Sequence, residues 1–303
     1  MTIKLFFELV EMKAKTASVL PFLIGLCYSY YRYGTLHLGY VGLYFVAMFI
    51  FNMAVDILDN YNDYKHATEE HDYKEKTNII GREQLSLRLL FWLMTGMIVF
   101  SAGLGLWLAT QVGWPLFWMG LYCYAVGIFY SSGPKPLSSL PLGEVFSGVT
   151  MGIMISLICV YLNAFEAFHW HFFEVLSIVI IALPNTMWIA NLMLANNICD
   201  LEEDRKNKRY TLVHYIGKKR ALSLFVTMNV IALVSIGLSV ILNLAPVSVL
   251  LSYLIVPFIW QQTTRFLQKQ DKQETFICAV KILAVGSTIQ VLTYLVGLLI
   301  PLF

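Results

Sequence analysis

Two clusters of acidic residues stand at the ends of long apolar runs. The first contains Asp56, Asp59 and Asp63, and the second contains Asp200 and Asp204. Asp59 and Asp63 are four residues apart, as are Asp200 and Asp204. A helix of about 3.6 residues per turn therefore stacks each of these two pairs on one face, where like charges repel. Neither pair has a Lys or Arg one turn earlier, so we expect a divalent cation as the partner. Oxygen ligands of this kind suit Mg²⁺.

The two clusters also have similar surroundings. Each carries Asn within about one turn of its acids, as Asn60 and Asn197 show, and each leads into a segment rich in Lys and Arg. One acid-rich helix end can simply be solvated. Two clusters with the same surroundings instead favour a site that holds a polyanion, such as a diphosphate, through bridging metals and flanking cations.

The composition places these clusters in a membrane protein. Of the 303 residues, 58% are hydrophobic and 13% charged, against roughly 25% charged in a soluble domain. The apolar runs are long enough to cross a hydrocarbon layer, and only helices satisfy their backbone groups there. We expect an all-α polytopic membrane protein, one domain over 1–303, with nine spans near residues 16–32, 38–60, 86–110, 114–131, 142–164, 173–197, 221–243, 246–263 and 276–302.

The placement of the basic residues predicts an orientation. With the N-terminus in the cytoplasm, the loops at 61–85 and 200–220 face inward, and Arg32 is the one basic residue near the outer face among 21 Lys and Arg. Both acid clusters then open to the cytoplasmic side of the cell membrane. The net charge of +2 does not suggest a nucleic-acid partner, no obligate protein partner is evident, and the five scattered cysteines form no disulfide framework.

Two segments, one of which contains the second acid cluster, resemble a known family. NNICDLEEDRKNKRYTL, beginning at Asn196, resembles the second aspartate motif of the UbiA superfamily of intramembrane prenyltransferases. YSSGPKPLSSLPLGEVFSG, at 130–148, is similar to a stretch of the branch that prenylates 1,4-dihydroxy-2-naphthoate. The first motif departs from the family pattern N-D-x-x-D, because this chain has DNYND at 59–63, Ala67 where some members carry a third acid, and Glu69 a little later.

The resemblance implies a fold and a reaction. It implies a helical bundle around a central cavity, and Mg²⁺-dependent transfer of a polyprenyl group from its diphosphate to 1,4-dihydroxy-2-naphthoate within the bilayer. The products are demethylmenaquinol, diphosphate and CO₂. Catalysis is then expected from Asp63, Asp200 and Asp204, and metal ligation from Asp56, Asp59, Asp63, Asp200 and Asp204.

The same resemblance assigns substrate-binding residues. Basic side chains beside the clusters would bind the diphosphate, although each is equally explained as a topology determinant: Arg205, Lys208, Arg209, Lys65 and Arg82. The other substrate contacts are expected from Asn60, Asn197, Tyr130 and Lys135. Glu144, an acid at the start of an apolar span, would either orient the acceptor or cap its helix.

Three alternatives stay open from the sequence. An ion-coupled transporter also carries intramembrane acids, but here the acids lie at span ends rather than mid-membrane. An alcohol phosphotransferase would need a D-G-x-x-A-R signature, which is absent. Within the superfamily, the acceptor could instead be 4-hydroxybenzoate, or the enzyme could farnesylate haem.

Overall fold

The computed structural model describes residues 2–66 and 78–300, and every regular element within them is helical. Glu69 and Ala67 lie outside these residues. The chain divides into two compact units. Unit 1 comprises Met1–Thr16 and Gly39–Leu137, and unit 2 comprises Ala17–Leu38 and Ser138–Phe303. The first acid cluster therefore belongs to unit 1 and the second to unit 2.

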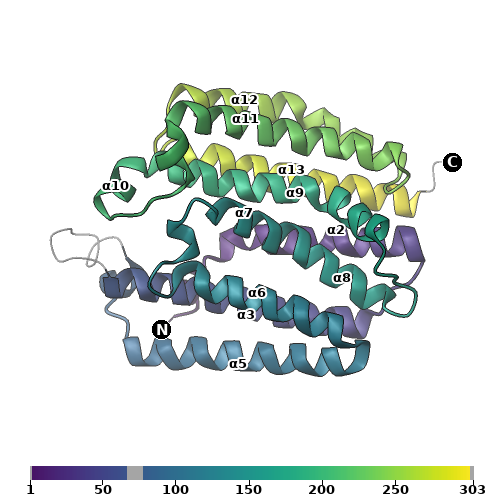
Figure 1. The fold of residues 1–303 in the computed structure, drawn as a ribbon, viewed down its shortest axis with the longest axis horizontal. Coiled ribbons are helices and arrows are strands. Elements are labelled where there is room, and N and C mark those ends of the chain that lie inside the picture. The colour runs from purple at the N-terminus through teal and green to yellow at the C-terminus, as the bar shows by residue number, and fades with distance from the viewer. Residues whose placement is uncertain (1, 67–77, 301–303) are drawn as a thin grey trace. The chain divides into compact units, whose positions relative to one another are not determined.

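Unit 1 is built on three long helices, shown in violet-blue to teal in Figure 1: α3 (Leu38–His66), α5 (Leu87–Val112) and α6 (Trp114–Ser131). The short α1 (Ile3–Leu9) and α4 (Ile79–Arg82) accompany them. Side-chain oxygens cap three of these helices, since Thr2 accepts from Leu5 N, Asn78 from Ile80 N and Ser86 from Leu89 N.

The turn between α5 and α6 is a tight hairpin, where the predicted spans at 86–110 and 114–131 leave only a few residues between them. Gly113 joins the two helices with a φ of 104°, a left-handed conformation that favours glycine. Pro115 follows in the first turn of α6, where its missing N–H costs no helical hydrogen bond. The hairpin places α5 and α6 side by side (Figure 1).

A hydrophobic cluster fixes the end of α3 that carries the first acids. It joins residues of α1, α3, α4 and α5: Leu9, Val10, Ile57, Leu58, Tyr61, Ile79, Ile80, Leu90 and Met94. Because these side chains are buried, the last turns of α3 cannot shift without exposing them to water. The positions of Asp59 and Asp63 are set by this packing.

Unit 2 contains α2 (Thr16–Tyr33) and an interrupted helix made of α7 (Gly143–Ser147), a π-helical segment (Gly148–Met154) and α8 (Ile155–Ala164). The remaining elements are α9 (Phe172–Cys199), α10 (Leu201–Lys206), α11 (Leu212–Ile241), a 3₁₀ segment (Val247–Ile255), α12 (Val256–Gln268) and α13 (Phe276–Leu299). Helix α9 packs against α7, α8, α11 and α13, so it lies at the centre of this unit (Figure 1).

Glycines allow the helices of unit 2 to approach closely. A Cβ on Gly152 would lie 2.8 Å from the backbone N of Thr186, and one on Gly148 would lie 2.8 Å from the Thr186 carbonyl oxygen. Gly286 of α13 gives similar room to the ring of Trp188 on α9. Such contacts between small residues are how helices pack in membranes, where apolar burial alone provides little driving force.

Fewer helices than the nine predicted spans meet the length and apolar composition that a membrane span requires. Among the described residues, seven helices are long and apolar enough to cross a membrane. The predicted spans at 16–32 and 114–131 do form helices, α2 and α6, but both are short and rich in Tyr or Trp, and neither is among the seven. The nine-span prediction is therefore not confirmed.

Replacement of Gly152 tests the packing of α9. We expect Gly152→Ala to destabilise the protein by about 1–3 kcal/mol, because the new Cβ meets backbone atoms that cannot rotate away. Gly96→Ala in α5 is the matched control, since nothing lies within 4 Å of its Cβ. Thermal unfolding in detergent measures both. Equal stability of the two variants would contradict the close approach of the π-helical segment to α9.

Candidate active site

The second acid cluster lies where α9 ends and α10 begins. Helix α9 stops at Cys199, and Asp200 leaves the helical conformation with φ of −93° and ψ of 7°. The backbone N–H of Asp204 then donates to the Asp200 carbonyl oxygen at 2.8 Å, which starts α10. The two acids are therefore one turn apart, but on a new short helix rather than on one continuous face of α9.

Asp200 is neutralised by a residue distant in sequence. The ammonium of Lys272, from the loop between α12 and α13, contacts both Asp200 Oδ2 and Asn196 Oδ1. Asp200 is mostly buried, with 20% of its side chain exposed, whereas 46% of Lys272 is exposed. The pair therefore lies at a surface that solvent reaches.

Asp204 is more deeply buried, with 7% of its side chain exposed. Arg209 Nε lies 3.3 Å from Asp204 Oδ1. Burial raises the pKa of the Asp204 carboxyl to about 6, and the nearby Arg209 opposes this rise. Its second oxygen, Oδ2, has no hydrogen-bond partner among the described residues. A buried carboxylate oxygen without a donor is an energetic cost that a bound cation would remove.

The two segments that resemble the family contact each other in unit 2. Tyr210 N donates to the Ser139 carbonyl oxygen at 3.1 Å, and Asn197 Nδ2 donates to Glu144 Oε1 at 2.9 Å. Glu144 is 1% exposed, and its Oε2 has no hydrogen-bond partner in the described part of the chain. Glu144 therefore fixes the side chain of Asn197, which lies three residues before Asp200. No cap made by a side chain is seen at the start of α7.

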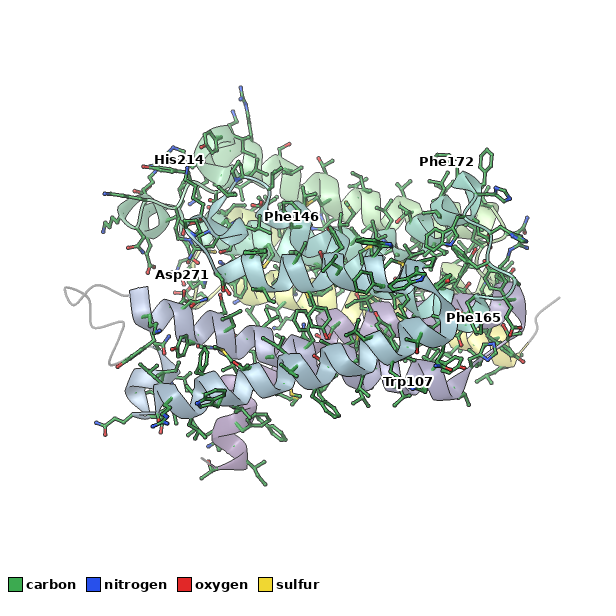
Figure 2. The ribbon with its side chains drawn as sticks, turned by 60° about the horizontal axis from the view of Figure 1, so that its bottom comes forward. Trp107, Phe146, Phe165, Phe172, His214 and Asp271 are labelled. Carbon is green, nitrogen blue, oxygen red and sulfur yellow. The ribbon has the colours of Figure 1, made fainter. Side chains whose placement is uncertain are left out.

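Figure 2 places this region at one end of unit 2. Asp271, next to Lys272, and His214, after the second cluster, both lie at that end, whereas Phe165 and Phe172 lie at the other. The second cluster, the loop before α13 and the start of α11 are thus gathered at the same end of the helices. This end of unit 2 is rich in charged side chains.

The first acid cluster lies on α3 in unit 1. Asp59 is half-buried and Asp63 is exposed, and both lie on the same helix one turn apart, as the spacing predicts. Asp56 is engaged by Lys15, whose ammonium contacts Asp56 Oδ2 and Asn52 Oδ1. Metal ligation by Asp56 stays a prediction, and it requires Lys15 to be displaced.

The amides near the first cluster hold the backbone of unit 1. Asn60 Nδ2 donates to the carbonyl oxygens of Leu9 at 3.4 Å and Asp56 at 3.1 Å. Asn62 Nδ2 donates to the Ser131 carbonyl oxygen at 3.0 Å, directly after Tyr130. Within unit 1, the start of the segment at 130–148 therefore contacts α3 next to Asp63, and within unit 2 its later part contacts residues on either side of Asp200 and Asp204.

The basic residues predicted to bind the diphosphate differ in the ion pairs that they make. Arg205 pairs with Glu202 at 3.0 Å on an exposed surface, and Lys208 is also exposed. Arg82 Nη2 lies 2.6 Å from Glu8 Oε1, and its Nε lies 3.0 Å from Glu83 Oε1. Surface pairs of this kind are weak, so they can be exchanged for an anionic ligand.

The remaining predicted basic residues are in unit 1. Lys65 Nζ lies 4.6 Å from the centre of the Tyr61 ring, a cation–π contact. Lys135 is exposed in the turn at 133–136, and no ion pair to it is found within the described ranges. Tyr130, five residues earlier, is half-buried.

The donor set at the second cluster fits a hydrated divalent cation. In the described part of the chain, no three side chains of His, Cys, Asp or Glu are grouped to hold a metal on their own. Mg²⁺ commonly takes one or two carboxylates and completes its shell with water and phosphate oxygens. The oxygens of Asn196 and Asp200 already converge on the ammonium of Lys272, and Asp204 Oδ2 is unsatisfied. These residues are suited to such an ion.

These features define an all-helical membrane protein whose acid clusters are suited to a cation and an anionic ligand. Residues 18–298 match the model of the UbiA prenyltransferase family, so the chain belongs to that family and is a prenyltransferase. This confirms the resemblance seen in the sequence, and it favours the prenyltransferase interpretation over the transporter and alcohol phosphotransferase alternatives.

Individual relatives are similar to this chain over nearly its full length. The chain is 26% identical over 300 residues to a 1,4-dihydroxy-2-naphthoate octaprenyltransferase of Bacillus subtilis, covering 99% of this chain and 94% of that protein. The fold is similar to a UbiA homologue from Aeropyrum pernix K1, with a TM-score of 0.72, 17% identity, and 93% of this chain and 98% of that chain covered. A UbiA homologue from Archaeoglobus fulgidus bound to DMAPP and Mg²⁺ gives a TM-score of 0.66, 14% identity, and coverage of 97% and 98%.

Two functional candidates were missed by sequence reasoning. Lys272 and Lys15 each neutralise a cluster acid, yet nothing near either lysine in the sequence marks it. A partial signal was present in the acids themselves, because Asn52 precedes Asp56 by four residues and Asn196 precedes Asp200 by four. This spacing predicts two oxygens on one helix face that can share a cation.

Proposed function

We propose that this prenyltransferase transfers a polyprenyl group from its diphosphate to 1,4-dihydroxy-2-naphthoate. One observation carries the proposal: the segment that resembles the naphthoate branch contacts the second aspartate motif through the Asn197–Glu144 and Tyr210–Ser139 hydrogen bonds. The full-length relationship to the Bacillus enzyme named for this reaction supports the same acceptor. The alternative acceptor within the family is 4-hydroxybenzoate.

The carboxylates bind the donor through a divalent cation in this proposal. When bound, Mg²⁺ neutralises the negative charge that develops on the departing diphosphate. Asp200 and Asp204 would supply carboxylate oxygens to such an ion in unit 2, and Asp59 and Asp63 would do so in unit 1. The relative of known structure that binds DMAPP and Mg²⁺ supports this ligand pair.

Basic residues bind the phosphate oxygens directly. Arg205 and Lys208 follow the second cluster on an exposed surface, and Arg209 is already held beside Asp204. Lys65 and Arg82 supply the corresponding charges in unit 1. Charge-assisted hydrogen bonds from these groups strengthen as the leaving group gains charge, so they assist the cleavage step.

The proposed reaction balances without an added oxidant. The C–O bond of the prenyl diphosphate breaks, and diphosphate leaves with the electron pair. The ring carbon that bears the carboxylate forms the new C–C bond to the allylic carbon. The electrons of the bond to the carboxylate then return to the ring, CO₂ leaves, and demethylmenaquinol is formed. Apolar surroundings protect the allylic cation from water.

The acceptor needs an apolar slot with a polar edge, because it is a flat ring that carries a carboxylate. Lys135 is exposed five residues after Tyr130, in the segment that resembles the naphthoate branch, so we assign it to the acceptor carboxylate. Asn60 donates to the Asp56 carbonyl oxygen and Asn197 donates to Glu144, so we assign both amides to positioning the clusters. Their contact with substrate stays a prediction.

The lysine and arginine distribution further supports an N-terminus in the cytoplasm, a C-terminus outside, and acid clusters that open to the cytoplasmic side. This orientation gives the clusters access to Mg²⁺ and to a water-soluble acceptor. The polyprenyl tail reaches the protein from the bilayer.

Removal of the metal or of its carboxylates tests the donor site. Activity should be lost in EDTA and return with Mg²⁺. Asp200→Asn and Asp204→Asn should each lower turnover at least about a hundredfold, as loss of a group that stabilises developing charge does. Glu203→Gln, which removes an exposed acid next to Asp204, is the matched control. Assays with radiolabelled prenyl diphosphate measure all of these, and near-normal turnover of both Asp variants would contradict the proposal.

A comparison of acceptors tests the specificity. Product mass spectrometry should show faster prenylation of 1,4-dihydroxy-2-naphthoate than of 4-hydroxybenzoate. Lys135→Ala should raise the KM for the naphthoate more than the KM for the prenyl diphosphate, because the exposed ammonium pairs with the acceptor carboxylate. Lys4→Ala, another exposed lysine of unit 1, should change neither KM. Faster use of 4-hydroxybenzoate would overturn the acceptor assignment while leaving the prenyltransferase intact.

Cysteine labelling in cells tests the orientation. The background carries Cys123→Ser and Cys199→Ser, since these two of the five cysteines are not buried. Gln111→Cys, at an exposed position of the α5–α6 hairpin, should react with an impermeant maleimide from outside. Asn207→Cys, exposed after α10, should react once the membrane is permeabilised. The reverse pattern would invert the proposed topology.

A further inference from the structure

Lys272 occupies the place where a cation would bind at the end of α9. Its ammonium contacts Asn196 Oδ1 and Asp200 Oδ2, two oxygens from positions one helical turn apart. An ammonium and a hydrated divalent cation seek the same oxygen donors with the same sign of charge. The lysine and a metal ion therefore compete for Asp200.

The loop that carries Lys272 is held in place by its own hydrogen bonds. Asp271 Oδ1 accepts the backbone N–H groups of Gln273 and Glu274, each at 2.9 Å. The Asp271 carbonyl oxygen accepts from the N–H groups of Thr275 and Phe276, each at 3.0 Å. The two hydrogen bonds to Oδ1, from Glu274 and Gln273, also keep the pKa of the Asp271 carboxyl below its usual value. Because this turn fixes the backbone, motion at Lys272 is left to its side chain.

Lys15 in unit 1 makes the same kind of contact as Lys272, but in a buried environment. Its ammonium contacts Asn52 Oδ1 and Asp56 Oδ2, again an amide and a carboxylate four residues apart. Only 5% of the Lys15 side chain is exposed, against 46% for Lys272. To separate Lys15 from Asp56 would leave a buried charge unpaired. Lys272 can leave Asp200 and remain hydrated, so its contact is exchangeable.

We propose that Lys272 is a tethered counter-ion, which neutralises Asp200 in the substrate-free enzyme and moves to an oxygen of the diphosphate when the metal binds. This inference rests on the proposed function, because it assigns Asp200 to the metal. In the resting enzyme the lysine stabilises the acid cluster without metal. In the loaded enzyme it adds a charge-assisted hydrogen bond to the donor.

The test uses full-length protein without substrate, titrated with Mn²⁺ while free Mn²⁺ is followed by electron paramagnetic resonance. Lys272→Met removes the competing charge and keeps an unbranched side chain. Its Mn²⁺ affinity should be tighter than that of the wild type by about fivefold, the upper end for an ion pair open to solvent. At saturating Mg²⁺, the same variant should show a higher KM for prenyl diphosphate and an unchanged KM for the aromatic acid.

Two variants control for structural effects. Lys269→Met removes a lysine of the same loop that pairs with Glu274 at 2.6 Å and should leave Mn²⁺ affinity and both KM values unchanged. Lys272→Arg keeps the charge and should bind Mn²⁺ as weakly as the wild type.

Three results would count against the inference. Unchanged or weaker Mn²⁺ affinity in Lys272→Met, with normal binding by the wild type, would overturn this inference alone. Tighter affinity in Lys272→Arg would also overturn it, because the competing charge is still present there. Absence of Mn²⁺ binding by the wild type, together with full turnover in EDTA, would overturn the proposed function as well.

Discussion

A carboxylate at the end of an apolar helix has to be neutralised, because it loses hydration beside low-dielectric surroundings. The chain meets this constraint with cations from elsewhere in the fold. Lys15 contacts Asp56, Lys272 contacts Asp200, and Arg209 lies beside Asp204. The Lys15 and Lys272 contacts also tie a turn or loop to the end of a long helix, α3 and α9 respectively. Neutralisation of the acids and anchoring of the surrounding segments are therefore the same interactions.

Burial decides what each of these contacts does. Lys15 is almost fully buried, so its pair with Asp56 holds the turn at Met12–Lys15 against α3 and is costly to break. Lys272 is accessible to water, so its pair with Asp200 is weak enough to be exchanged. A lysine that contacts an amide oxygen and a carboxylate thus anchors the backbone in unit 1, whereas in unit 2 the same kind of contact is exchangeable.

The close packing of α9 holds the residues of the second cluster in fixed positions. Gly148 and Gly152 bring the interrupted helix against Thr186, and Gly286 brings α13 against Trp188. With α9 held from these sides, Glu144 can accept the Asn197 hydrogen bond, which fixes the last turn before Asp200. Charged groups that must bind an ion and a diphosphate need such rigid support, since small displacements weaken electrostatic stabilisation.

The sequence by itself determined the helices, the family and the acid clusters. Apolar runs and their spacing predict the helices closely, as at α6 and α9, because helical hydrogen bonds join residues four apart and are local. The short separation of the predicted spans at 86–110 and 114–131 is also consistent with the hairpin at Gly113. Only the tertiary structure showed that Asp200 lies outside α9 and that Lys15 and Lys272 are the partners of acids 41 and 72 residues away along the chain. Which cation meets which carboxylate depends on how distant loops fold back, and no local pattern carries that information.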